Sequence, residues 1–485
     1  MSQASSTKAT EARNACSASL KPSVVIVGAG PAGVRAAQTL VAHGLRPVVI
    51  DESPKSGGQI YRRQPSNFSR PLKALYGFEA GRAGAVHATF DTMVPQLDYR
   101  ANSLVWNAQG QALDVLDGST GATSTVPYSH LIIATGATDR VLPFEGWTLP
   151  GVFTLGGTQV ALKYQGCAIG QRPVLVGTGP LLYLVAYQYA KAGVAVQAVI
   201  DSATLQDQVA AVPALAAQPG MLIKGAYYLA WLLAHGVPIY RGARPVRALG
   251  DHRVTGLVWH DGKRERKLSC DAIGTGYGLR SETQLADLLG CEFEFSAQQH
   301  AHLPVRDDMG RSSVAGVYLA GDGASIQGAI AAELSGELAA WTLLGDLGKS
   351  VDAPRIQSLH AAIGKTDRFG CGLERGFALP KLWADQASDA LVICRCENIT
   401  AGELRQCVAT EGVTEINRLK ALTRVGMGRC QGRMCGGAAI EVLAHAAQQP
   451  VQGLGRLRAQ APIKPVPLAM TLATVQDSAA GEGAP

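Results

Sequence analysis

The sequence predicts an α/β chain made of two strand–glycine loop–helix units, followed by a small helical C-terminal domain. Three observations carry this prediction. A short apolar run at 24–27 leads into glycines at positions 28, 30 and 33. A second glycine loop begins at residue 177, and four cysteines in two close pairs lie beyond residue 390. The 485 residues suggest about three domains at roughly 150 residues each.

Composition and charge exclude several classes of protein. The formal net charge of +6 is small for this length and no long Lys/Arg stripe occurs, so we predict no nucleic-acid partner. No apolar run reaches the ~18 residues of a membrane span. Residues 1–21 are polar and lack the apolar segment of a secretory signal, so we expect a disordered lead and a cytoplasmic protein. Thiols stay reduced there, which favours ligands or buried thiols over disulfides.

The first glycine unit spans residues 23–53 and contains every part of a dinucleotide-binding motif. An apolar strand precedes Gly28, Gly30 and Gly33, a helical segment follows, and a second strand ends at Asp51. The glycines let the backbone approach a pyrophosphate at a helix N-terminus. Asp51 is placed to accept a hydrogen bond from a ribose hydroxyl. We therefore predict a bound dinucleotide.

Three later motifs narrow the choice of dinucleotide. They are SGGQIYRR at 56–63, ATG at 134–136 and YLAGD at 318–322. In this order they resemble the flavoproteins with two dinucleotide-binding domains, the glutathione-reductase-like fold, over residues 22 to about 350. The resemblance implies FAD, with Asp322 hydrogen-bonded to the ribityl chain. The predicted FAD-binding residues are Gly28, Gly30, Pro31, Ala32, Gly33, Asp51, Glu52, Gly58, Gln59, Arg62, Ala134, Thr135, Gly136, Gly321, Asp322, Gly328 and Ala329.

The second glycine unit, residues 172–201, departs from the motif at one position. Gly177 and Gly179 are present, but Leu182 replaces the third glycine and Asp201 ends the unit. The third glycine normally allows close packing of helix on strand, so a leucine should push the helix outward and loosen the phosphate site. We expect the domain to keep its fold. Productive use of NAD(P)H stays open, and an adenine nucleotide in a structural role is the alternative.

Two cysteine pairs dominate the C-terminal segment. Cys394 and Cys396 form C-x-C, and after 33 residues Cys430 and Cys435 form C-x4-C. Glycines around the second pair permit the tight loop that a metal centre needs. Four cysteines could bind zinc or an iron–sulfur cluster, although C-x-C is less usual for zinc.

The stretches CRCENIT and TRVGMGRCQGRMC resemble the bacterioferritin-associated-ferredoxin-like domain over residues 391–447. That resemblance implies a [2Fe-2S] cluster with Cys394, Cys396, Cys430 and Cys435 as its ligands. Cys407 is predicted to be a core residue instead of a ligand. It lies in a helix that Thr400 caps, with Glu403 at the capping-box position.

Basic residues outnumber acidic ones around the cysteines. Between residues 394 and 435 there are seven Lys or Arg and four Glu, a surplus that would offset a negatively charged cluster. Arg395, Arg429 and Arg433 are neighbours of the cysteines in sequence. We expect these three to raise the reduction potential by favouring the added electron.

The predicted domain organisation is a split first domain with an insertion. It comprises a disordered lead (1–21), an FAD-binding domain (22–165 and 279–350), an inserted NAD-binding-like domain (166–278), a connector (351–390), a [2Fe-2S]-binding domain (391–447) and an extended tail (448–485). Aromatic residues in the connector favour a packed segment over a free linker.

The motif set as a whole resembles the alpha chains of heteromeric amino-acid and amine dehydrogenases. That group includes hydrogen cyanide synthase, opine oxidase, hydroxyproline dehydrogenase, dye-linked proline dehydrogenase and sarcosine oxidase. The resemblance implies a D-amino-acid-oxidase-like beta subunit that carries its own FAD and oxidises the C–N bond. It also implies a small ferredoxin-like gamma subunit, with FMN at an interface between chains. No catalytic residue beside the flavin motifs is identified, which agrees with oxidation in another chain.

Two other functions compete with the hypothesis of an electron-transfer chain in a larger enzyme. One is a stand-alone NAD(P)H-dependent flavin and [2Fe-2S] oxidoreductase, against which Leu182 argues. The other is an iron–sulfur storage or scaffold protein without enzymatic activity. The sequence does not select a substrate among opine, hydroxyproline, sarcosine, proline and glycine.

Overall fold

The computed structural model describes residues 23–468, so the predicted lead and the end of the predicted tail lie outside the described part. Its first sheet has five parallel strands. In spatial order they are β20 (Val317–Leu319), β7 (His130–Ile133), β1 (Val24–Val27), β2 (Val48–Ile50) and β3 (Asp98–Arg100). Val25 on β1 pairs with Val48 and with Leu131. The strands are short apolar runs because both faces of the sheet are covered.

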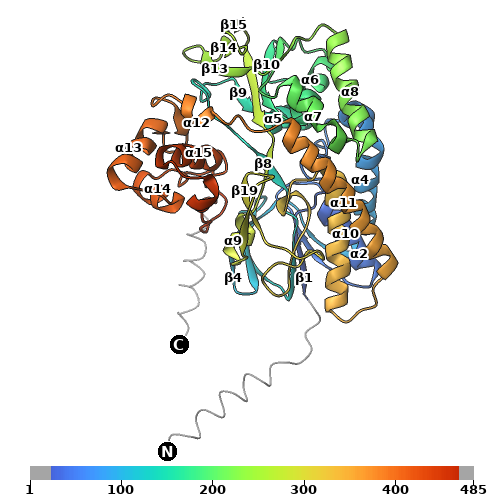
Figure 1. The fold of residues 1–485 in the computed structure, drawn as a ribbon. Helices are drawn as coiled ribbons and strands as arrows, with labels where there is room; N and C mark the ends of the chain where they lie inside the picture. Colours follow the sequence, from blue (N-terminus) through green and yellow to red (C-terminus); the bar gives the residue numbers. More distant parts are fainter. Residues whose placement is uncertain (1–22, 469–485) are drawn as a thin grey trace, which may run out of the picture.

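Helices cover one face of this sheet and a second, antiparallel sheet covers the other (Figure 1). The helices are α2 (Pro31–Ala42), α4 (Ala80–Met93) and α10 (Ala329–Asp346), and the antiparallel strands are β4 (Ser103–Gln109), β5 (Ala112–Asp117) and β6 (Thr123–Pro127). Helices α2 and α10 touch, since a Cβ atom at Gly336 would lie 2.1 Å from the carbonyl oxygen of Ala32.

A second parallel sheet forms the upper domain in Figure 1. Its strands are, in order, β12 (Ile239–Arg241), β11 (Ala198–Asp201), β10 (Pro173–Thr178), β16 (Ala272–Tyr277) and β9 (Val152–Thr154). Helices α5 (Leu155–Val160), α6 (Pro180–Lys191) and α8 (Pro219–Ala234) pack on one side. The antiparallel strands β13 (Arg244–Leu249), β14 (Gly256–His260) and β15 (Glu265–Ser269) pack on the other.

Two paired strands carry the chain between these domains. Strand β8 (Ala137–Asp139) leaves the first domain and β17 (Leu279–Ser281) returns antiparallel to it. Short elements complete this part: α3 (Leu72–Tyr76), η1 (Gly77–Glu79), η2 (Val94–Gln96), the π-helical turn η3 (Ala161–Gln165), α7 (Leu205–Leu215), α9 (Gln284–Leu288), β18 (Phe293–Ser296), β19 (Ala301–Pro304) and η4 (Gly321–Gly323).

The segment predicted as a connector is mainly a long helix. Helix α11 (Ala353–Gly376) has 24 residues and packs against both α7 and α10. Asp352 caps it by accepting a hydrogen bond from the backbone N–H of Arg355 at 2.9 Å. None of the helices within residues 23–468 is long and apolar enough to cross a membrane.

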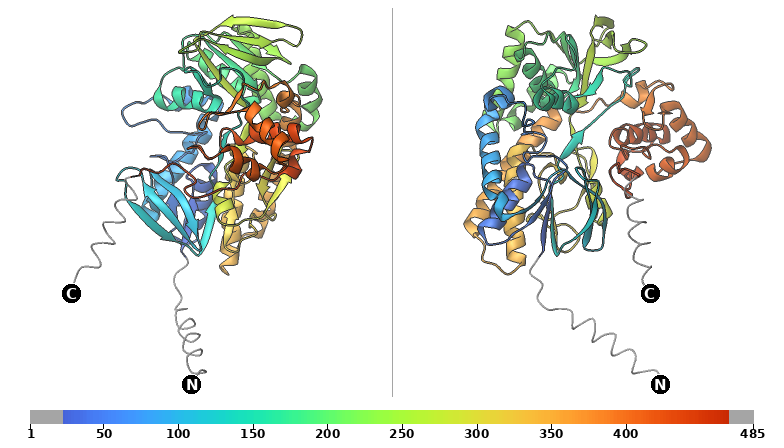
Figure 2. Two further views of the ribbon diagram at one scale, coloured as in Figure 1. Left: turned by 90° about the vertical axis from the view of Figure 1, so that its left-hand side faces the viewer. Right: turned by 180° about the vertical axis from the view of Figure 1, so that it is seen from behind.

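The C-terminal domain is small and mostly helical, and it lies against the body of the molecule (Figure 2). Its elements are α12 (Trp383–Gln386), β21 (Val392–Cys394), β22 (Ile399–Thr400), α13 (Ala401–Glu411), α14 (Ile416–Thr423), α15 (Gly436–Ala447) and η5 (Val451–Leu454). The predicted capping box is confirmed: Thr400 accepts from the Glu403 backbone N–H, and the Glu403 side chain accepts from that of Thr400. Two parallel sheets and a small helical end together confirm the predicted α/β class.

Candidate flavin and cysteine-cluster sites

The first glycine loop is built so that no side chain fits at two of its positions. A Cβ atom at Gly28, whose φ is +108°, would lie 2.3 Å from the carbonyl oxygen of Ala134. A Cβ at Gly33 would lie 1.8 Å from the carbonyl oxygen of Gly28. Helix α2 starts directly after Gly30, so Pro31 lies in its first turn. No side chain caps this end of the helix. The N-terminus of α2 is therefore available to a phosphate.

The predicted SGGQIYRR motif folds against this loop. A Cβ atom at Gly58 would lie 2.9 Å from the Cα atom of Gly30, so the two glycine segments touch. The backbone N–H of Gly57 donates to the carbonyl of Ala29 at 2.8 Å. Arg62 donates to the side chain of Gln59 at 2.7 Å. Its guanidinium also lies 5.5 Å from the centre of the Tyr164 ring.

Asp51 follows β2 and is nearly buried beside the same loop. Its carboxylate accepts hydrogen bonds from the backbone N–H groups of Ala29 and Ser53, and burial raises its pKa. A carboxylate has about four acceptor positions, so positions remain for ribose hydroxyls. Glu52, which the sequence also places in the site, points elsewhere and pairs with Lys464.

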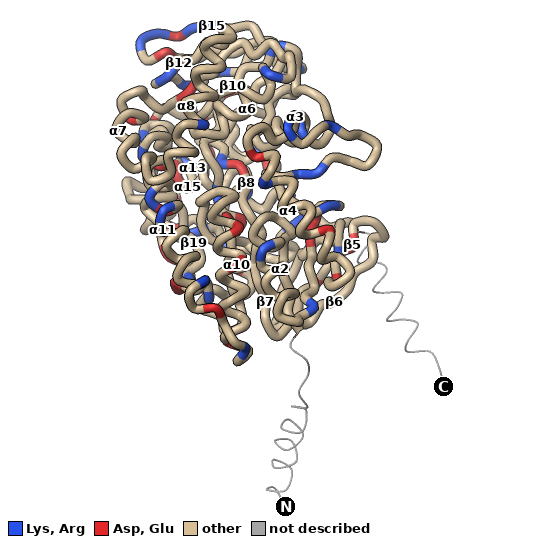
Figure 3. The backbone as a smooth tube through the Cα atoms, turned by 90° about the vertical axis from the view of Figure 1, so that its right-hand side faces the viewer, with Lys and Arg blue, Asp and Glu red and all other residues tan. Residues whose placement is uncertain are grey.

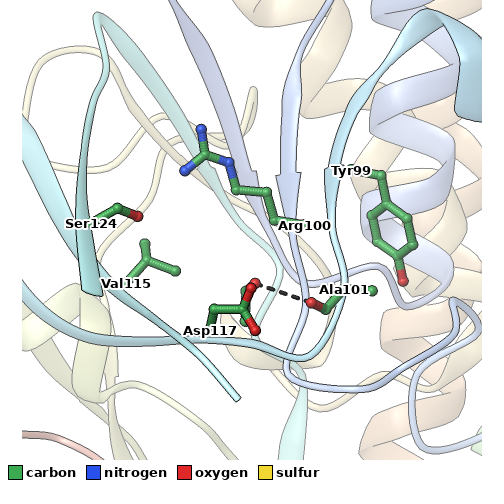
Figure 4. Close-up of a pocket in the computed structure, with 7 residues that line it drawn as sticks. Tyr99, Arg100, Ala101, Val115, Asp117 and Ser124 are labelled. Atoms are coloured by element: carbon green, nitrogen blue, oxygen red, sulfur yellow. Dashed lines mark hydrogen bonds between the residues drawn. The ribbon is translucent and has the colours of Figure 1, made fainter. Parts of the chain in front are cut away.

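A cavity of about 360 Å³ lies among β3, β4, β5 and β6, close to the end of β2 (Figure 4). The backbone N–H of Asp51 donates to the carbonyl of Arg100, and that of Ser103 donates to the carbonyl of Asp51. The Tyr99 hydroxyl is buried with no hydrogen-bond partner in the described residues. The lining residues are Tyr99, Arg100, Ala101, Ser103, Val115, Asp117 and Ser124.

The ATG and YLAGD motifs meet at the carboxyl ends of β7 and β20. A Cβ atom at Gly323 would lie 2.7 Å from the hydroxyl oxygen of Thr135. One oxygen of Asp322 accepts from the backbone N–H groups of Gln327 and Gly328, both at 2.9 Å. Its second oxygen has no hydrogen-bond partner among the residues that the structure describes. Gly328 and Ala329 begin α10, whose first turn has no side-chain cap.

Apart from Glu52, which pairs with Lys464, the predicted FAD-binding residues come together along one edge of the sheet. The ends of β20, β7, β1 and β2 are adjacent there, and both α2 and α10 begin at it. This is where ligands bind in open parallel sheets. Glycines without room for a Cβ, two uncapped helix N-termini and a free carboxylate oxygen fit a dinucleotide.

In the second glycine unit the acidic residue is not available to a ligand. Asp201 is fully buried, and both of its oxygens accept two hydrogen bonds each from the chain itself. The donors are the Thr178 hydroxyl at 2.8 Å, the Ala203 N–H at 2.9 Å, the Tyr183 hydroxyl at 2.6 Å and the Gln208 side-chain amide at 2.9 Å. Leu182 lies in the first turn of α6 and is buried in the core between that helix and the second sheet. Four donors fill the acceptor positions of the carboxylate, so a ribose would have to displace them.

The four predicted cluster ligands come together in the C-terminal domain. The thiol of Cys394 contacts that of Cys435, Cys435 contacts Cys430, and Cys430 contacts Cys396. Cys394 and Cys435 are buried, and the other two are partly exposed. Gly428 must be a glycine, because its Cβ would lie 2.2 Å from that of Cys396.

Hydrogen bonds lower the pKa of two of these thiols and so favour the loss of their protons. The Cys435 thiol, and then backbone N–H groups, hold the pKa of Cys394 at about 6 and that of Cys430 at about 5. The pKa of Cys435 is raised because its thiol donates to both. Backbone N–H groups around cysteine sulfurs are a feature of iron–sulfur sites. Within residues 23–468 no group of three or more His, Cys, Asp or Glu is arranged to hold a single metal ion.

Cys407 lies apart from this quartet, as the sequence indicates. It is partly buried on α13, and the charged groups near its thiol are Glu411 and Arg418. The nine cysteines of the described residues form no disulfide.

The three arginines expected to offset the cluster charge differ in their surroundings. Arg395 lies 5.8 Å from the ring centre of Trp147, and Arg429 is exposed. Arg433 forms a bidentate ion pair with Glu282, with nitrogen–oxygen distances of 2.6 and 3.1 Å. The charge of Arg433 is therefore shared with a carboxylate. A different cation, the partly buried Arg280, lies close enough to Cys430 and Cys435 to feel their charges.

Glu282 links the two candidate sites, and sequence reasoning missed it. Burial acts to raise its pKa, but the charge and hydrogen bonds of Arg433 outweigh burial and hold the pKa below its usual range. Its carbonyl accepts from the Thr135 hydroxyl at 2.7 Å. One residue thus contacts both the ATG motif and the loop between Cys430 and Cys435. About 150 positions separate it from Arg433, and no local pattern could have signalled the pair.

Comparison with known proteins gives two family matches. Residues 22–363 match the model of the pyridine nucleotide-disulphide oxidoreductases, and residues 392–445 match that of the BFD-like [2Fe-2S] binding domain. An opine oxidase subunit of Agrobacterium tumefaciens is 35% identical over 92% of this chain and 90% of its own length. The HcnB subunit of the hydrogen cyanide synthase of Pseudomonas aeruginosa is 35% identical over 91% of this chain and 97% of its own.

A solved structure supports the fold. The L-proline dehydrogenase of P. horikoshii superposes with a TM-score of 0.69 and 20% identity, over 93% of this chain and 79% of its own. These matches confirm the glutathione-reductase-like fold, FAD as cofactor and a [2Fe-2S] domain. The chain belongs to the pyridine nucleotide-disulphide oxidoreductase family, as an FAD-dependent oxidoreductase with a C-terminal BFD-like [2Fe-2S] domain.

Proposed function

We propose that this chain is the electron-transfer subunit of a heteromeric amino-acid dehydrogenase, in which a partner subunit oxidises the C–N bond. The observation that carries the proposal is the Glu282 junction between the flavin motifs and the cysteine quartet. Relatives at 35% identity are themselves named as subunits, of opine oxidase and of hydrogen cyanide synthase. The substrate class is a secondary amine, an opine or a hydroxyproline-type amino acid.

The residues of the sheet edge have separate roles in this proposal. The loop from Gly28 to Gly33 and the start of α2 hold the pyrophosphate. Asp51 accepts from the ribose, with the adenine end near the Tyr99 cavity. The free oxygen of Asp322 accepts from the ribityl chain. FAD exchanges two electrons at a time and a [2Fe-2S] cluster exchanges one. A chain with both groups can therefore accept electrons in pairs and pass them on one at a time.

The cysteine quartet completes the path within the same chain. Cys394, Cys396, Cys430 and Cys435 hold the cluster. Their backbone N–H donors and the nearby Arg280 stabilise negative charge at the sulfurs.

The closed second glycine unit favours this function over a stand-alone NAD(P)H reductase. Asp201 has its four hydrogen bonds from the chain, and Leu182 occupies the place of the third glycine. An adenine nucleotide bound there without hydride transfer is compatible with the proposal.

The proposed partners are a D-amino-acid-oxidase-like beta subunit with its own FAD and a small ferredoxin-like gamma subunit. FMN at the interface with the beta subunit belongs to the same proposal. Cytoplasm is the proposed compartment, which the absence of disulfides among the described cysteines supports.

Anaerobic reduction with and without the partner tests the proposal. The chain would be purified alone and together with its beta subunit, then mixed with octopine, hydroxyproline, proline, sarcosine or NADH. We expect one of these amines to bleach the flavin and produce the cluster's EPR signal only when the partner is present. Amine oxidation by the chain alone, or flavin reduction by NADH at catalytic rates, would contradict the proposal.

A further inference from the structure

Lys163 is a buried lysine for which the proposed electron transfer has no use. It lies in η3, the π-helical turn after α5, and its side chain is 5% exposed. Lysine is almost never this buried unless it is paired. Its Nζ has no hydrogen bond or ion pair in the described residues. Its one contact of note is with the ring of Tyr76, whose centre lies 5.9 Å from Nζ.

Because Lys163 has no counter-charge among the described residues, its burial destabilises the folded protein. Removing an ammonium group from water without pairing it destabilises the charged form, and burial lowers the pKa of Lys163 to about 8. At neutral pH the group is still mostly charged. A residue of this kind suggests a ligand that supplies the missing negative charge.

Lys163 lines a cavity of about 160 Å³ between the two large domains. The walls come from α3 and η1 on one side and from α6 and α8 on the other. Tyr76, Tyr187 and Tyr228 form part of them. The cavity is open at its rim, so a small molecule can enter from solvent.

All the charged residues that line this cavity are cations. Arg70, Lys73 and Lys191 join Lys163, and no Asp or Glu is among the lining residues. Figure 3 shows the Lys and Arg positions that gather along α3. Glu79, which follows the lining residue Gly77 in η1, is already engaged by Lys224 and Arg82.

The positions of Arg70, Lys73 and Lys191 at the mouth of the cavity are explained without a ligand, whereas that of Lys163 is not. Lys191 is exposed in the last turn of α6, where a cation offsets the helix dipole, and its Nζ donates to the Tyr187 hydroxyl at 3.1 Å. Arg70 lies 5.4 Å from the ring centre of Phe68. Arg70 and Lys73 are exposed and solvated.

We propose that this cavity binds a phosphate group, with Lys163 as the buried charge that receives it and Arg70, Lys73 and Lys191 at its mouth. A phosphate dianion fits a lining of four cations better than a singly charged carboxylate does. It accepts several charge-assisted hydrogen bonds, and the cavity has room for one phosphate and a short ester tail.

This site is distinct from both glycine loops. Gly177 and Gly179 lie before the N-terminus of α6, whereas Lys191 is its last residue. Twelve residues of helix span roughly 18 Å. The first glycine loop belongs to the other sheet. A phosphate in the cavity therefore cannot be the pyrophosphate of a dinucleotide bound at the second loop, and no residue of the first loop lines the cavity.

Thermal unfolding of the full chain, loaded with FAD and cluster in a phosphate-free buffer, tests the proposal. Orthophosphate should raise the unfolding temperature above that in chloride of equal ionic strength. Lys163→Met should weaken the apparent affinity for orthophosphate at least about tenfold. The same variant should unfold at a higher temperature than the wild type when phosphate is absent, since it removes an unpaired buried charge.

The control is Lys349→Met, an exposed lysine after α10, which should behave as the wild type in both conditions. Methyl phosphate and acetate identify the ligand chemistry. Stabilisation by orthophosphate alone supports a free ion, and equal stabilisation by methyl phosphate supports a phosphomonoester. Equal stabilisation by acetate, no effect of phosphate on the wild type, or the same effect on Lys163→Met would overturn the proposal.

Discussion

The four proposed cluster ligands differ in how much the protein alone determines their positions. Cys394 ends β21 and Cys435 precedes α15, so regular elements fix both, and both are buried. Cys430 lies in an irregular loop and is partly exposed, with its sulfur held by the backbone N–H groups of Met434 and Gly432. Substitution at Cys430 should therefore remove a ligand without opening the core.

Cys430→Ser should abolish the cluster's EPR signal while FAD stays bound. Serine preserves the size of the side chain but replaces the thiolate that an iron–sulfur cluster requires. The measurement is EPR of the reduced protein together with the flavin absorption spectrum. Cys407→Ser is the matched control and should keep both signals. Retention of the cluster in Cys430→Ser would contradict the ligand assignment.

His87 is one residue through which pH acts on the stability of the first domain. Its Nε2 is 2.8 Å from the carbonyl oxygen of Tyr61, so it anchors the SGGQIYRR loop. Burial lowers the pKa of His87, although the hydrogen bond to Tyr61 opposes the effect. The unfolded chain then takes up the proton first as the pH falls. Stability from His87 is complete above about pH 6.5 and is lost as the pH falls through the pKa of the folded protein.

His87→Gln should flatten the dependence of unfolding free energy on pH between about 7 and 5. Glutamine can keep the hydrogen bond to Tyr61 but does not titrate. Urea denaturation at several pH values measures the effect, and His252→Gln on an exposed loop should leave the wild-type profile unchanged. An equally steep profile in His87→Gln would show that another group carries the acid sensitivity.

At the scale of elements, the ion pair between Glu282 and Arg433 fixes the loop between Cys430 and Cys435 on the segment that joins β17 to α9. Both side chains are largely buried, at 8% and 16% exposure. Removing one partner of such a pair leaves a buried charge unpaired, at a cost of about 3 kcal/mol. An exposed pair is worth under about 1 kcal/mol.

Glu282→Gln should therefore lower the free energy of unfolding by about 3 kcal/mol and slow electron transfer from flavin to cluster. Arg424→Gln is the matched control, because its pair with Glu397 lies in the same domain but Arg424 is 66% exposed. Urea denaturation measures stability, and rapid mixing with dithionite-reduced partner measures transfer. If both variants behaved alike, Glu282 would have no special role in docking.

Local patterns could be predicted from the sequence, and contacts between distant segments could not. Gly33, which packs against Gly28, and the Thr400–Glu403 capping box depend on a few neighbouring residues, so their spacing suffices. Glu282 pairs with Arg433, and Arg280 lies near Cys430 and Cys435, each about 150 positions away along the chain. Nothing in the sequence around Glu282 or Arg280 marks that role. The charge of Arg433 could be counted from the sequence, but its ion-pair partner Glu282 could not be identified from it.

At the scale of the whole molecule, the cluster domain shares one core with the second large domain. Trp147 and Leu257 pack in the same buried cluster as Leu404 and Val442. The Trp147 indole N–H also donates to the carbonyl of Val392 at 2.7 Å. Farther along, Arg456 pairs with the buried Asp287 of the flavin domain. A domain attached in this way cannot unfold without exposing the apolar surface of its neighbour.

The three domains should therefore unfold in one cooperative transition. Flavin fluorescence and cluster absorption, recorded during the same thermal scan, should report one midpoint in the wild type. Trp147→Phe keeps an aromatic side chain but loses part of the indole's volume and the hydrogen bond to Val392, so the midpoints should fall together. Combining it with Glu282→Gln removes two of the polar connections and leaves the Arg456–Asp287 pair, and the cluster signal should then be lost first. Separate midpoints in the wild type would show instead that the cluster domain is a mobile appendage, and electron transfer would then require a docking step.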